Sequence, residues 1–324
     1  MTSARASKTL WSLMLVFASV GAAAQDYPTR VIRWVVPYAP GGGTDTTARN
    51  IAPLMSAGLG QQVIIDNRPG GAANPGTDYV AKAPADGYTW LLANIAFGAN
   101  PSLFRKLPFD TERDFAPVSK VAFAPLVLVV HPSIPARTMQ ELITFAKTKP
   151  GTLNYGSGGI GSANHLAAEV FRSYTKIDIV HVPYKGGGPA VTDLVGGQIP
   201  IVFANLASSR PHVTSGRLRA LAVSSAKRSP ALKDLPTLQE LGLSGVDVSE
   251  WQLLVVPAAT PAAIIDRIHR EIVRAVADQT VKERLASLGA TVEGTSPQEA
   301  ARFLKSELAL WRRVVREAGI TAMD

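Results

Sequence analysis

Two closely similar stretches decide the fold: residues 36–45 read Val-Pro-Tyr-Ala-Pro-Gly-Gly-Gly-Thr-Asp, and residues 182–189 read Val-Pro-Tyr-Lys-Gly-Gly-Gly-Pro. Each stretch follows a short apolar run that predicts a buried strand and precedes a segment that predicts a helix. Ligands of open α/β sheets bind at this place, beyond the carboxyl end of a strand. Glycine lets a ligand approach the backbone, and a helix N-terminus presents unpaired N–H groups to an anion. A single glycine-rich turn can be only a tight connection, but two copies about half a chain apart predict two half-sites across a cleft.

The rest of the chain alternates short apolar runs with amphipathic segments. The apolar runs predict buried strands, and the amphipathic segments predict helices. This alternation predicts an α/β protein with mostly parallel sheets. The predicted strands are residues 31–36, 63–66, 88–93, 126–130, 153–155, 177–182, 199–203, 218–223 and 253–256, and the predicted helices are residues 44–58, 138–147, 163–174, 189–195, 261–277, 281–288 and 297–317.

The composition indicates a globular protein and excludes several kinds of site. The 324 residues suffice for about two domains, and 46% of them are hydrophobic. The absence of cysteine excludes disulfides, thiol nucleophiles, iron–sulfur clusters and cysteine-bound zinc. The formal net charge of +8 suits an anionic partner, but basic residues are interspersed with acidic ones, as in residues 302–316. We therefore expect no nucleic-acid partner.

Residues 1–24 have the pattern of a secretory signal peptide. Arg5 and Lys8 precede an apolar run over residues 10–20, and small residues follow at positions 21–24. The alternative is an N-terminal membrane anchor, which needs about 20 apolar residues to cross a bilayer, and this run is shorter. We therefore expect export to the periplasm, with the signal peptide removed near Ala24.

A third glycine-rich loop contains the G-x-G-x-x-G pattern of dinucleotide-binding proteins. Residues 155–162 read Tyr-Gly-Ser-Gly-Gly-Ile-Gly-Ser between a predicted strand and a predicted helix, so a dehydrogenase is an alternative. The pattern also requires an acid at the end of the next strand. That strand ends in Pro-Tyr-Lys at residues 183–185, and Asp178 lies near its start. A carboxylate at the helix N-terminus after Ser162 fits the loop better.

No other motif indicates catalysis. The five histidines are scattered without metal-ligand spacing, and the sequence contains neither a P-loop nor a nucleophile elbow. We therefore expect a protein that is not an enzyme, with no catalytic residue, no cofactor and no metal.

An ordered set of short motifs extends over nearly the whole chain after the signal peptide. The most specific is His-Val-Pro-Tyr-Lys-Gly at residues 181–186. The others are Tyr-Pro (27–28), Val-Val-Pro-Tyr (35–38), Gly-Gly-Gly-Thr-Asp (41–45), Asp-Asn-Arg-Pro-Gly (66–70), Ala-Asp-Gly-Tyr-Thr (85–89), Asp-Phe-Ala-Pro-Val (114–118), Lys-Pro-Gly (149–151), Asn-Tyr-Gly-Ser (154–157), Leu-Ala-Val (221–223) and Pro-Thr (236–237). With these motifs the chain resembles the periplasmic substrate-binding proteins of tripartite tricarboxylate transporters, the Bug-type extracytoplasmic solute receptors.

The resemblance implies a two-lobed α/β fold, the type II periplasmic-binding-protein fold or Venus flytrap. Two interlobe crossovers belong to this fold, and we expect them at the apolar runs 126–130 and 253–256. Lobe 1 is then expected to comprise residues 25–125 and 250–324, and lobe 2 residues 126–249. The implied function is to capture a small organic carboxylate between the lobes and deliver it to the membrane components of a tripartite tricarboxylate-type transporter. We expect the receptor to be a monomer.

In the family, a ligand carboxylate is held by the loop after the first strand and by facing loops of the second lobe, partly through ordered water. Lys185 is expected to steer an anion electrostatically, with a solvent-facing lysine as the alternative. Asp45 is expected to cap a helix or to accept hydrogen bonds from a ligand hydroxyl, amine or bridging water. Carried over by position, the ligand-binding residues are Tyr38, Gly42, Thr44, Asp45, Asn94, Ser157, Gly158, Ser162, Lys185, Gly186 and Asn205.

The sequence departs from the family pattern near the expected site. Many relatives have an acid after the predicted strand 199–203, where this chain has Ala204 and Asn205. We expect the loss of this acid to ease binding of a second negative group or of an aromatic group. Residues 73–76 and 94–97 also differ from the family pattern. The ligand is thus a dicarboxylate, an aromatic carboxylate or an amino acid, and an exported enzyme and a periplasmic sensory or structural protein remain alternative functions.

Overall fold

The computed structural model describes residues 27–229, 232–243 and 247–317, so the predicted signal peptide lies outside the described residues. The strands are β1 (Ile32–Val36), β2 (Val63–Asn67), β3 (Thr89–Asn94), β4 (Phe115–Val130), β5 (Leu153–Ser157), β6 (Ile179–Pro183), β7 (Ile201–Asn205), β8 (Arg219–Val223), β9 (Ser249–Pro257) and β10 (Thr291–Val292). The helices are α1 (Gly43–Leu59), the short 3₁₀ helix η1 (Gly71–Ala73), α2 (Asn74–Ala81), α3 (Ile95–Leu103), α4 (Met139–Lys147), α5 (Ala163–Thr175), α6 (Gly187–Val195), α7 (Leu206–Thr214), α8 (Ala262–Ala277), α9 (Gln279–Ser287) and α10 (Pro297–Glu317).

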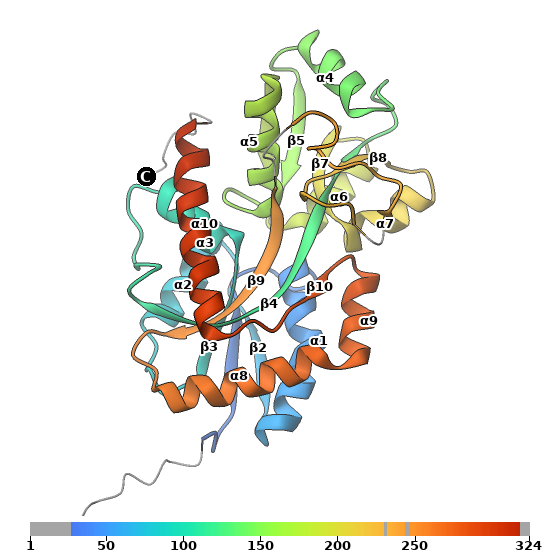
Figure 1. The fold of residues 1–324 in the computed structure, drawn as a ribbon. Coiled ribbons are helices and arrows are strands. Elements are labelled where there is room, and N and C mark those ends of the chain that lie inside the picture. The colour runs from blue at the N-terminus through green and yellow to red at the C-terminus, as the bar shows by residue number, and fades with distance from the viewer. Residues whose placement is uncertain (1–26, 230–231, 244–246, 318–324) are drawn as a thin grey trace, which may run out of the picture.

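The molecule is elongated and has two halves, which two long strands join (Figure 1). The first half contains β1–β3 and β10 with α1–α3 and α8–α10, and the second half contains β5–β8 with α4–α7. The strand order is β2-β1-β3-β9-β4-β7-β5-β6, with β8 and β10 paired to β4. Within each half the strands that alternate with helices pair in parallel, β1 with β2 and β3, and β5 with β6 and β7. The predicted alternation is correct for these strands.

The two joining strands, β4 and β9, are antiparallel to each other and to their other partners. Their pairing runs from Phe115 opposite Pro257 to Pro125 opposite Ser249. The prediction of mostly parallel sheets is wrong for this central part, because β4 carries the chain from the first half to the second and β9 brings it back. The predicted apolar runs 126–130 and 253–256 lie within these two strands.

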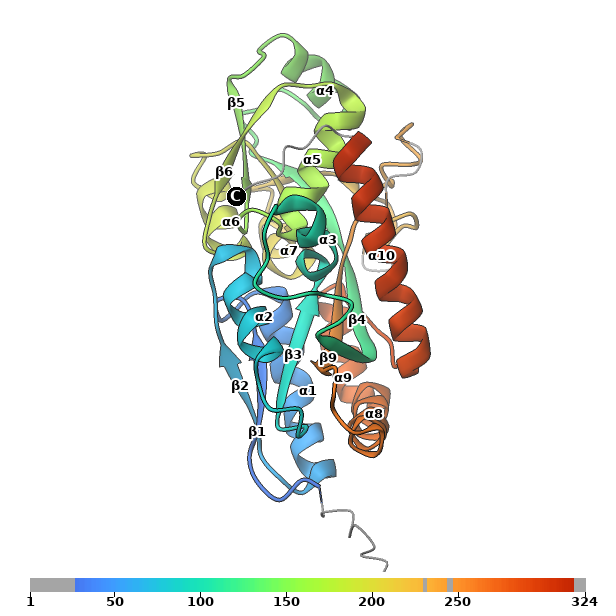
Figure 2. The same ribbon diagram turned by 90° about the vertical axis from the view of Figure 1, so that its left-hand side faces the viewer.

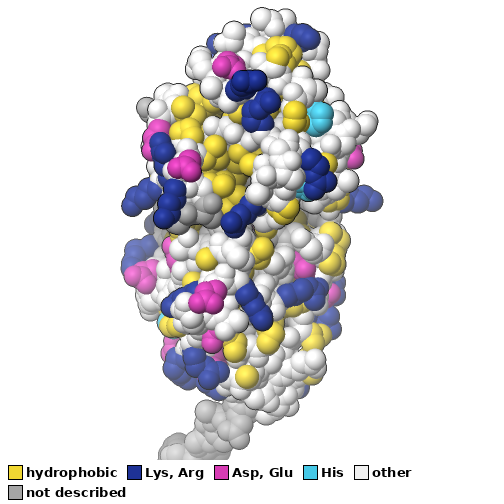
Figure 3. All heavy atoms as spheres, turned by 90° about the vertical axis from the view of Figure 1, so that its right-hand side faces the viewer, with side chains coloured by type: hydrophobic (Ala, Val, Ile, Leu, Met, Phe, Trp, Pro, Cys, Tyr) yellow, Lys and Arg dark blue, Asp and Glu magenta, His cyan; other side chains and the backbone are white. Residues whose placement is uncertain are grey.

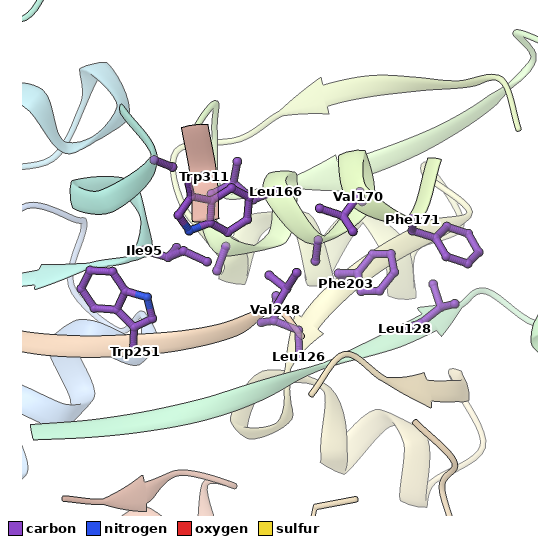
Figure 4. Packing of buried hydrophobic residues seen from close by; sticks show 14 of the residues in the cluster. Ile95, Leu126, Leu128, Leu166, Val170, Phe171, Phe203, Val248, Trp251 and Trp311 are labelled. Atoms are coloured by element: carbon purple, nitrogen blue, oxygen red, sulfur yellow. The ribbon is translucent and has the colours of Figure 1, made fainter. Parts of the chain in front are cut away.

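The largest apolar core is continuous through both halves. In Figure 4 it extends from Trp251 on β9 and Trp311 on α10, past Leu126 on β4, to Phe203 on β7 and Phe171 on α5. Helix α10 packs along α3 and β4, beside the joining strands (Figure 2). Two smaller clusters lie beneath α1 and α8 in the first half and beneath α6 in the second. No helix in the described ranges combines the length and the apolar character needed to cross a membrane.

Ser224 joins the two long strands where they enter the second half. Its hydroxyl accepts a hydrogen bond from the Leu126 N–H at 2.9 Å and donates to the Val248 carbonyl at 2.5 Å. Its own N–H donates to the Leu126 carbonyl at 2.8 Å, and its side chain is fully buried. The hydroxyl thus satisfies one buried backbone group on β4 and one directly before β9.

We expect Ser224→Ala to lower the free energy of unfolding by about 1–3 kcal/mol, because it leaves a buried donor and a buried acceptor unpaired. Urea unfolding followed by circular dichroism measures this change. Ser306→Ala is the control: its hydroxyl donates to the Phe303 carbonyl on an exposed part of α10, and its loss should stay within about 0.5 kcal/mol. Equal effects of the two variants would contradict the assigned role of Ser224.

Candidate ligand-binding site

A cavity of about 340 Å³ lies between the two halves. Its walls come from the glycine-rich loops of both halves, from β9 and from the segment after α9. The predicted site residues that line it are Tyr38, Gly42, Thr44, Asn94, Gly158, Ser162, Lys185, Gly186 and Asn205. The structure therefore brings together residues that are distant in the sequence, whereas Asp45 and Ser157 lie behind the wall.

Five helices begin at the wall of this cavity. Their N-cap residues are Gly42 for α1, Asn94 for α3, Ser162 for α5, Gly186 for α6 and Asn205 for α7. The first N–H groups of a helix have no partner within the helix, and the helix dipole adds a partial positive charge there. The ends of these helices therefore create a positive potential in a cavity that has little formal charge.

Three of the five N-termini have no side-chain cap. Gly42 and Gly186 have no side chain to accept a capping hydrogen bond, and the Asn205 side chain accepts none from the first turn of α7. These three caps come from both halves, so backbone N–H groups on opposite walls are left to bind an anion.

The other two N-termini are capped by their own side chains. Ser162 accepts a hydrogen bond from the His165 N–H at 3.4 Å. The Asn94 Oδ1 accepts from the Ala96 N–H at 3.1 Å and from the Tyr38 hydroxyl at 2.8 Å. Burial raises the pKa of Tyr38, so this hydroxyl is a neutral donor. Both bonds use Oδ1, so the Asn94 amide nitrogen is directed away from them, and a hydrogen bond from the Asn94 side chain lowers the pKa of Glu250.

Asp45 supports the first glycine-rich loop from behind. Its carboxylate accepts hydrogen bonds from the Gly41 N–H at 2.9 Å, from Arg49 at 2.9 Å and from Asn67 at 2.8 Å. Burial alone raises the pKa of Asp45, but these hydrogen bonds outweigh it and lower the pKa below its usual value. Of the two expected roles, the contacts match the structural one, because an acid in the first turn of α1 binds the backbone ahead of the helix.

Ser157 supports the glycine-rich loop of the second half in a similar way. Its hydroxyl lies 2.6 Å from His181 Nε2 and accepts a hydrogen bond from the Gly159 N–H at 3.0 Å. The His181 ring packs against the His165 ring at 4.4 Å between centroids, and the Gly161 N–H donates to His165 Nδ1 at 3.3 Å. Two histidines thus hold the loop in shape, and the described residues contain no cluster of side chains that could bind a metal.

Glu250 is a site residue that the sequence analysis missed. It lies on β9, is 7% exposed and lines the cavity. Its Oε1 accepts a hydrogen bond from the Thr44 hydroxyl at 3.1 Å, and its Oε2 accepts one from the Asn205 amide. Burial raises the pKa of Glu250, while hydrogen bonds from Asn205, Thr44 and Asn94 partly oppose this effect. The acid that the chain lacks after its strand β7 is thus supplied by another strand, so the basis for expecting a site without an acid is wrong.

Two further amides at the wall were missed. Asn164 donates from its side chain to the Phe203 carbonyl, which ties α5 to β7. Gln252 lies two residues after Glu250 on the same face of β9, and its Oε1 is buried without a hydrogen-bond partner within the described residues.

The cavity wall contains one cation and one acid among the described residues, Lys185 and Glu250. Lys185 is exposed at the rim. On the face shown in Figure 3, basic side chains are scattered over both halves among acidic ones, and hydrophobic side chains gather in the second half. The attraction for an anion therefore comes from the helix ends and one lysine, not from a basic cluster.

Comparison with known proteins identifies the family. A model of the tripartite tricarboxylate transporter family receptor, TctC, matches residues 47–320. The chain belongs to this family. It is also 38% identical to the protein BugT of Bordetella pertussis over 298 residues, which cover 91% of this chain and 91% of BugT.

Solved structures of family members have the same fold. The R. palustris protein Rpa4515 with adipate has a TM-score of 0.87 and 37% identity, and the match covers 92% of this chain and all of that one (100%). The periplasmic binding protein BugD has a TM-score of 0.87 and 32% identity over 92% of this chain and 100% of its own. MatC (Rpa3494) from Rhodopseudomonas palustris with bound malate has a TM-score of 0.85 and 32% identity over 89% of this chain and 100% of its own. These matches confirm the two-lobed periplasmic-binding fold and the resemblance to Bug-type receptors.

The histidine pair predicts a loss of stability in acid. Burial is the main cause that lowers the pKa of His165 and of His181 to about 4, from 6.5. When folding lowers the pKa of a histidine, the unfolded protein binds a proton at a higher pH than the folded protein does. The stability of the folded protein is therefore fully present above the pKa of the unfolded state, and it decreases as the pH falls toward the pKa of the folded state. We therefore expect the free energy of unfolding to decrease between pH 6.5 and pH 4, by up to about 3 kcal/mol for the buried His165.

Urea unfolding at several pH values measures this decrease. His165→Gln should flatten the pH dependence, because the glutamine does not titrate. His131→Gln, at a partly exposed histidine after β4, should keep the wild-type pH dependence. Parallel curves for wild type and His165→Gln would rule out this origin of the acid sensitivity.

Proposed function

We propose that the protein captures a small organic carboxylate in the cavity between its lobes and delivers it to the membrane components of a tripartite tricarboxylate-type transporter. The observation that carries the proposal is the convergence of three uncapped helix N-termini, from both halves, on one cavity. Family membership supports the receptor role. Relatives with adipate and malate support a carboxylate as the ligand.

The lobes, the location and the oligomeric state are part of the same proposal. Lobe 1 comprises residues 25–125 and 250–324, and lobe 2 comprises residues 126–249, with the boundaries on β4 and β9. The chain is exported to the periplasm after removal of residues 1–24 and acts there as a monomer. A ligand then contacts lobe 1 through the loop before α1 and lobe 2 through the loops before α5 and α6.

The ligand carboxylate is held mostly by backbone N–H groups. No arginine lines the cavity among the described residues, and the cation at its rim is Lys185. The Thr44 and Ser208 hydroxyl groups at the wall already donate within the protein, to the Glu250 carboxylate and the Asn205 carbonyl, so they can only accept hydrogen bonds from a ligand. Fixed N–H groups of this kind need no reorganisation when the anion enters, which favours tight binding.

Gly42→Val tests the site directly. A Cβ at Gly42 would meet only the Ala39 carbonyl oxygen at 3.8 Å, and its φ of −76° suits any residue, so the variant should fold. The added side chain should occupy the space at the first N–H groups of α1 and abolish binding. We expect thermal-shift and calorimetric titrations with malate, adipate and aspartate to show that the wild type binds at least one of them, with a stabilisation of about 2.7 kcal/mol at a hundred times Kd, and that the variant binds none.

Gly196→Val is the matched control. Gly196 also has a φ of −76°, lies at the C-terminal end of α6 outside the cavity, and offers a Cβ ordinary contacts at 3.6 Å and beyond. This variant should bind as the wild type does. Normal binding by a folded Gly42→Val protein would place the ligand elsewhere and overturn the proposed site.

Lys185 contributes long-range attraction to the ligand. We expect Lys185→Ala to weaken carboxylate binding by about 1 kcal/mol at low ionic strength, and by much less at about 0.5 M salt, because salt screens an exposed charge. Calorimetry at the two salt concentrations measures both values. Lys147→Ala, at an exposed lysine on α4 outside the cavity, should change neither. If Lys185→Ala and the wild type bind equally tightly at low salt, Lys185 is a solvent-facing lysine that does not contribute to binding.

A further inference from the structure

We propose that Glu250 and Gln252 accept hydrogen bonds from an ammonium group of the ligand, so that the protein selects amino acids over dicarboxylates. This inference rests on the proposed function and adds the ligand class.

Glu250 presents a carboxylate whose surroundings already supply hydrogen-bond donors. The Thr44 hydroxyl and the Asn205 amide both donate to it, from the first half and the second half respectively. These donors keep the Glu250 carboxylate oxygens as hydrogen-bond acceptors, because an ionised carboxylate can only accept hydrogen bonds. At the cavity wall, the group that complements it is a further donor from the ligand, and an ammonium group also complements its charge.

Gln252 supplies the second, independent observation. It is 2% exposed and lines the cavity, and its Oε1 is buried without a hydrogen-bond partner among the described residues. A buried acceptor without a partner costs free energy that a ligand donor can recover. Side chains two residues apart on a strand point to the same face, so Glu250 and Gln252 form a pair of acceptors on one wall.

The pair lies close to the anion-binding end of α1. A Cβ at Gly43, the first residue of α1, would be 3.2 Å from the Glu250 Oε2 and 3.3 Å from the Asn205 amide nitrogen. If the ligand carboxylate binds the first N–H groups of α1, the Glu250 carboxylate therefore lies close to the rest of the ligand. This spacing suits a ligand whose ammonium and carboxylate are separated by one to three carbon atoms.

A dicarboxylate meets the opposite situation. Its second carboxylate would face Glu250 across a short distance in a cavity with few cations. Like charges at close range in a poorly solvated site repel strongly. The same acid thus attracts an ammonium group and rejects a second carboxylate, which is how one residue can set specificity.

The test uses ligand pairs that exchange a carboxylate for an ammonium group at the same carbon. The pairs are succinate with β-alanine and glutarate with 4-aminobutyrate, and malate with aspartate compares a hydroxyl with an ammonium group. Calorimetric titration of the full mature chain gives the affinity ratio within each pair. We expect the ammonium member to bind at least about tenfold more tightly in wild type.

Two variants separate recognition from folding. Glu250→Gln removes the charge and keeps one acceptor, so the affinity ratio should fall by at least about tenfold. Gln252→Leu removes an acceptor that has no partner in the described structure. This variant should therefore keep its thermal stability and still lower the ratio, by a smaller factor of about two to five.

Glu307→Gln is the matched control. Glu307 is a partly buried acid whose pKa burial raises, but it accepts hydrogen bonds from the indole N–H groups of Trp251 and Trp311 on the other side of β9. Its substitution should leave the affinity ratios unchanged.

The outcomes distinguish the two levels of the proposal. A dicarboxylate that binds wild type as tightly as its ammonium partner overturns the inference and leaves the carboxylate receptor in place. Ratios that Glu250→Gln and Gln252→Leu leave unchanged overturn it as well. Binding of no compound in the three pairs overturns the proposed function together with the inference.

Discussion

The antiparallel pairing of β4 with β9 is the constraint on which the site depends. Because side chains alternate along a strand, this pairing directs Ala124, Glu250 and Gln252 to the cavity between the halves. It directs Phe123 and Trp251 to the opposite side, where they line a second cavity of about 430 Å³ beside α10. A register shift of one residue would exchange the two faces of β9 and place Trp251 in the site and Glu250 among aromatic side chains. The register of two strands therefore fixes both the chemistry of the site and the packing of α10.

Around these strands, the fold concentrates helix N-termini at one place. Parallel strands that alternate with helices bring the carboxyl ends of the strands, and hence the starts of the following helices, to the same edge of the sheet. Each half does this separately, and the joining strands set the two edges facing each other. Each helix contributes about half an elementary charge at its start. The wall of this cavity has glycine-rich loops and no arginine among the described residues, so the positive potential in it comes mainly from helix ends.

The sequence was informative where local patterns decide the structure. Helix α10 has its predicted bounds, because a long amphipathic pattern needs no distant partner to be recognised. Helices α3 and α7 were missed because each has nine residues and contains a proline, Pro101 or Pro211. Their starting residues, Asn94 and Asn205, were nevertheless predicted as site residues. The 16-residue strand β4 was predicted only from residue 126 onward, because Pro117 and Pro125 argue against a strand interior, and the structure accommodates Pro117 at a register irregularity.

Glu250 could not be predicted by the same means. In the sequence, Glu250 is only an acid just before the apolar run 253–256. Burial of an acid is itself no evidence that the acid has a function. Glu307 makes this point, because it is partly buried with a raised pKa and yet its hydrogen bonds join β9 to α10. Glu250 differs because Thr44 in the first half and Asn205 in the second both donate to it. A ligand group bound at Glu250 would therefore contact a residue that is hydrogen-bonded to both halves. If the ligand carboxylate is held by the helix ends and its second group by Glu250, then affinity comes from the lobes and specificity comes from the strand between them.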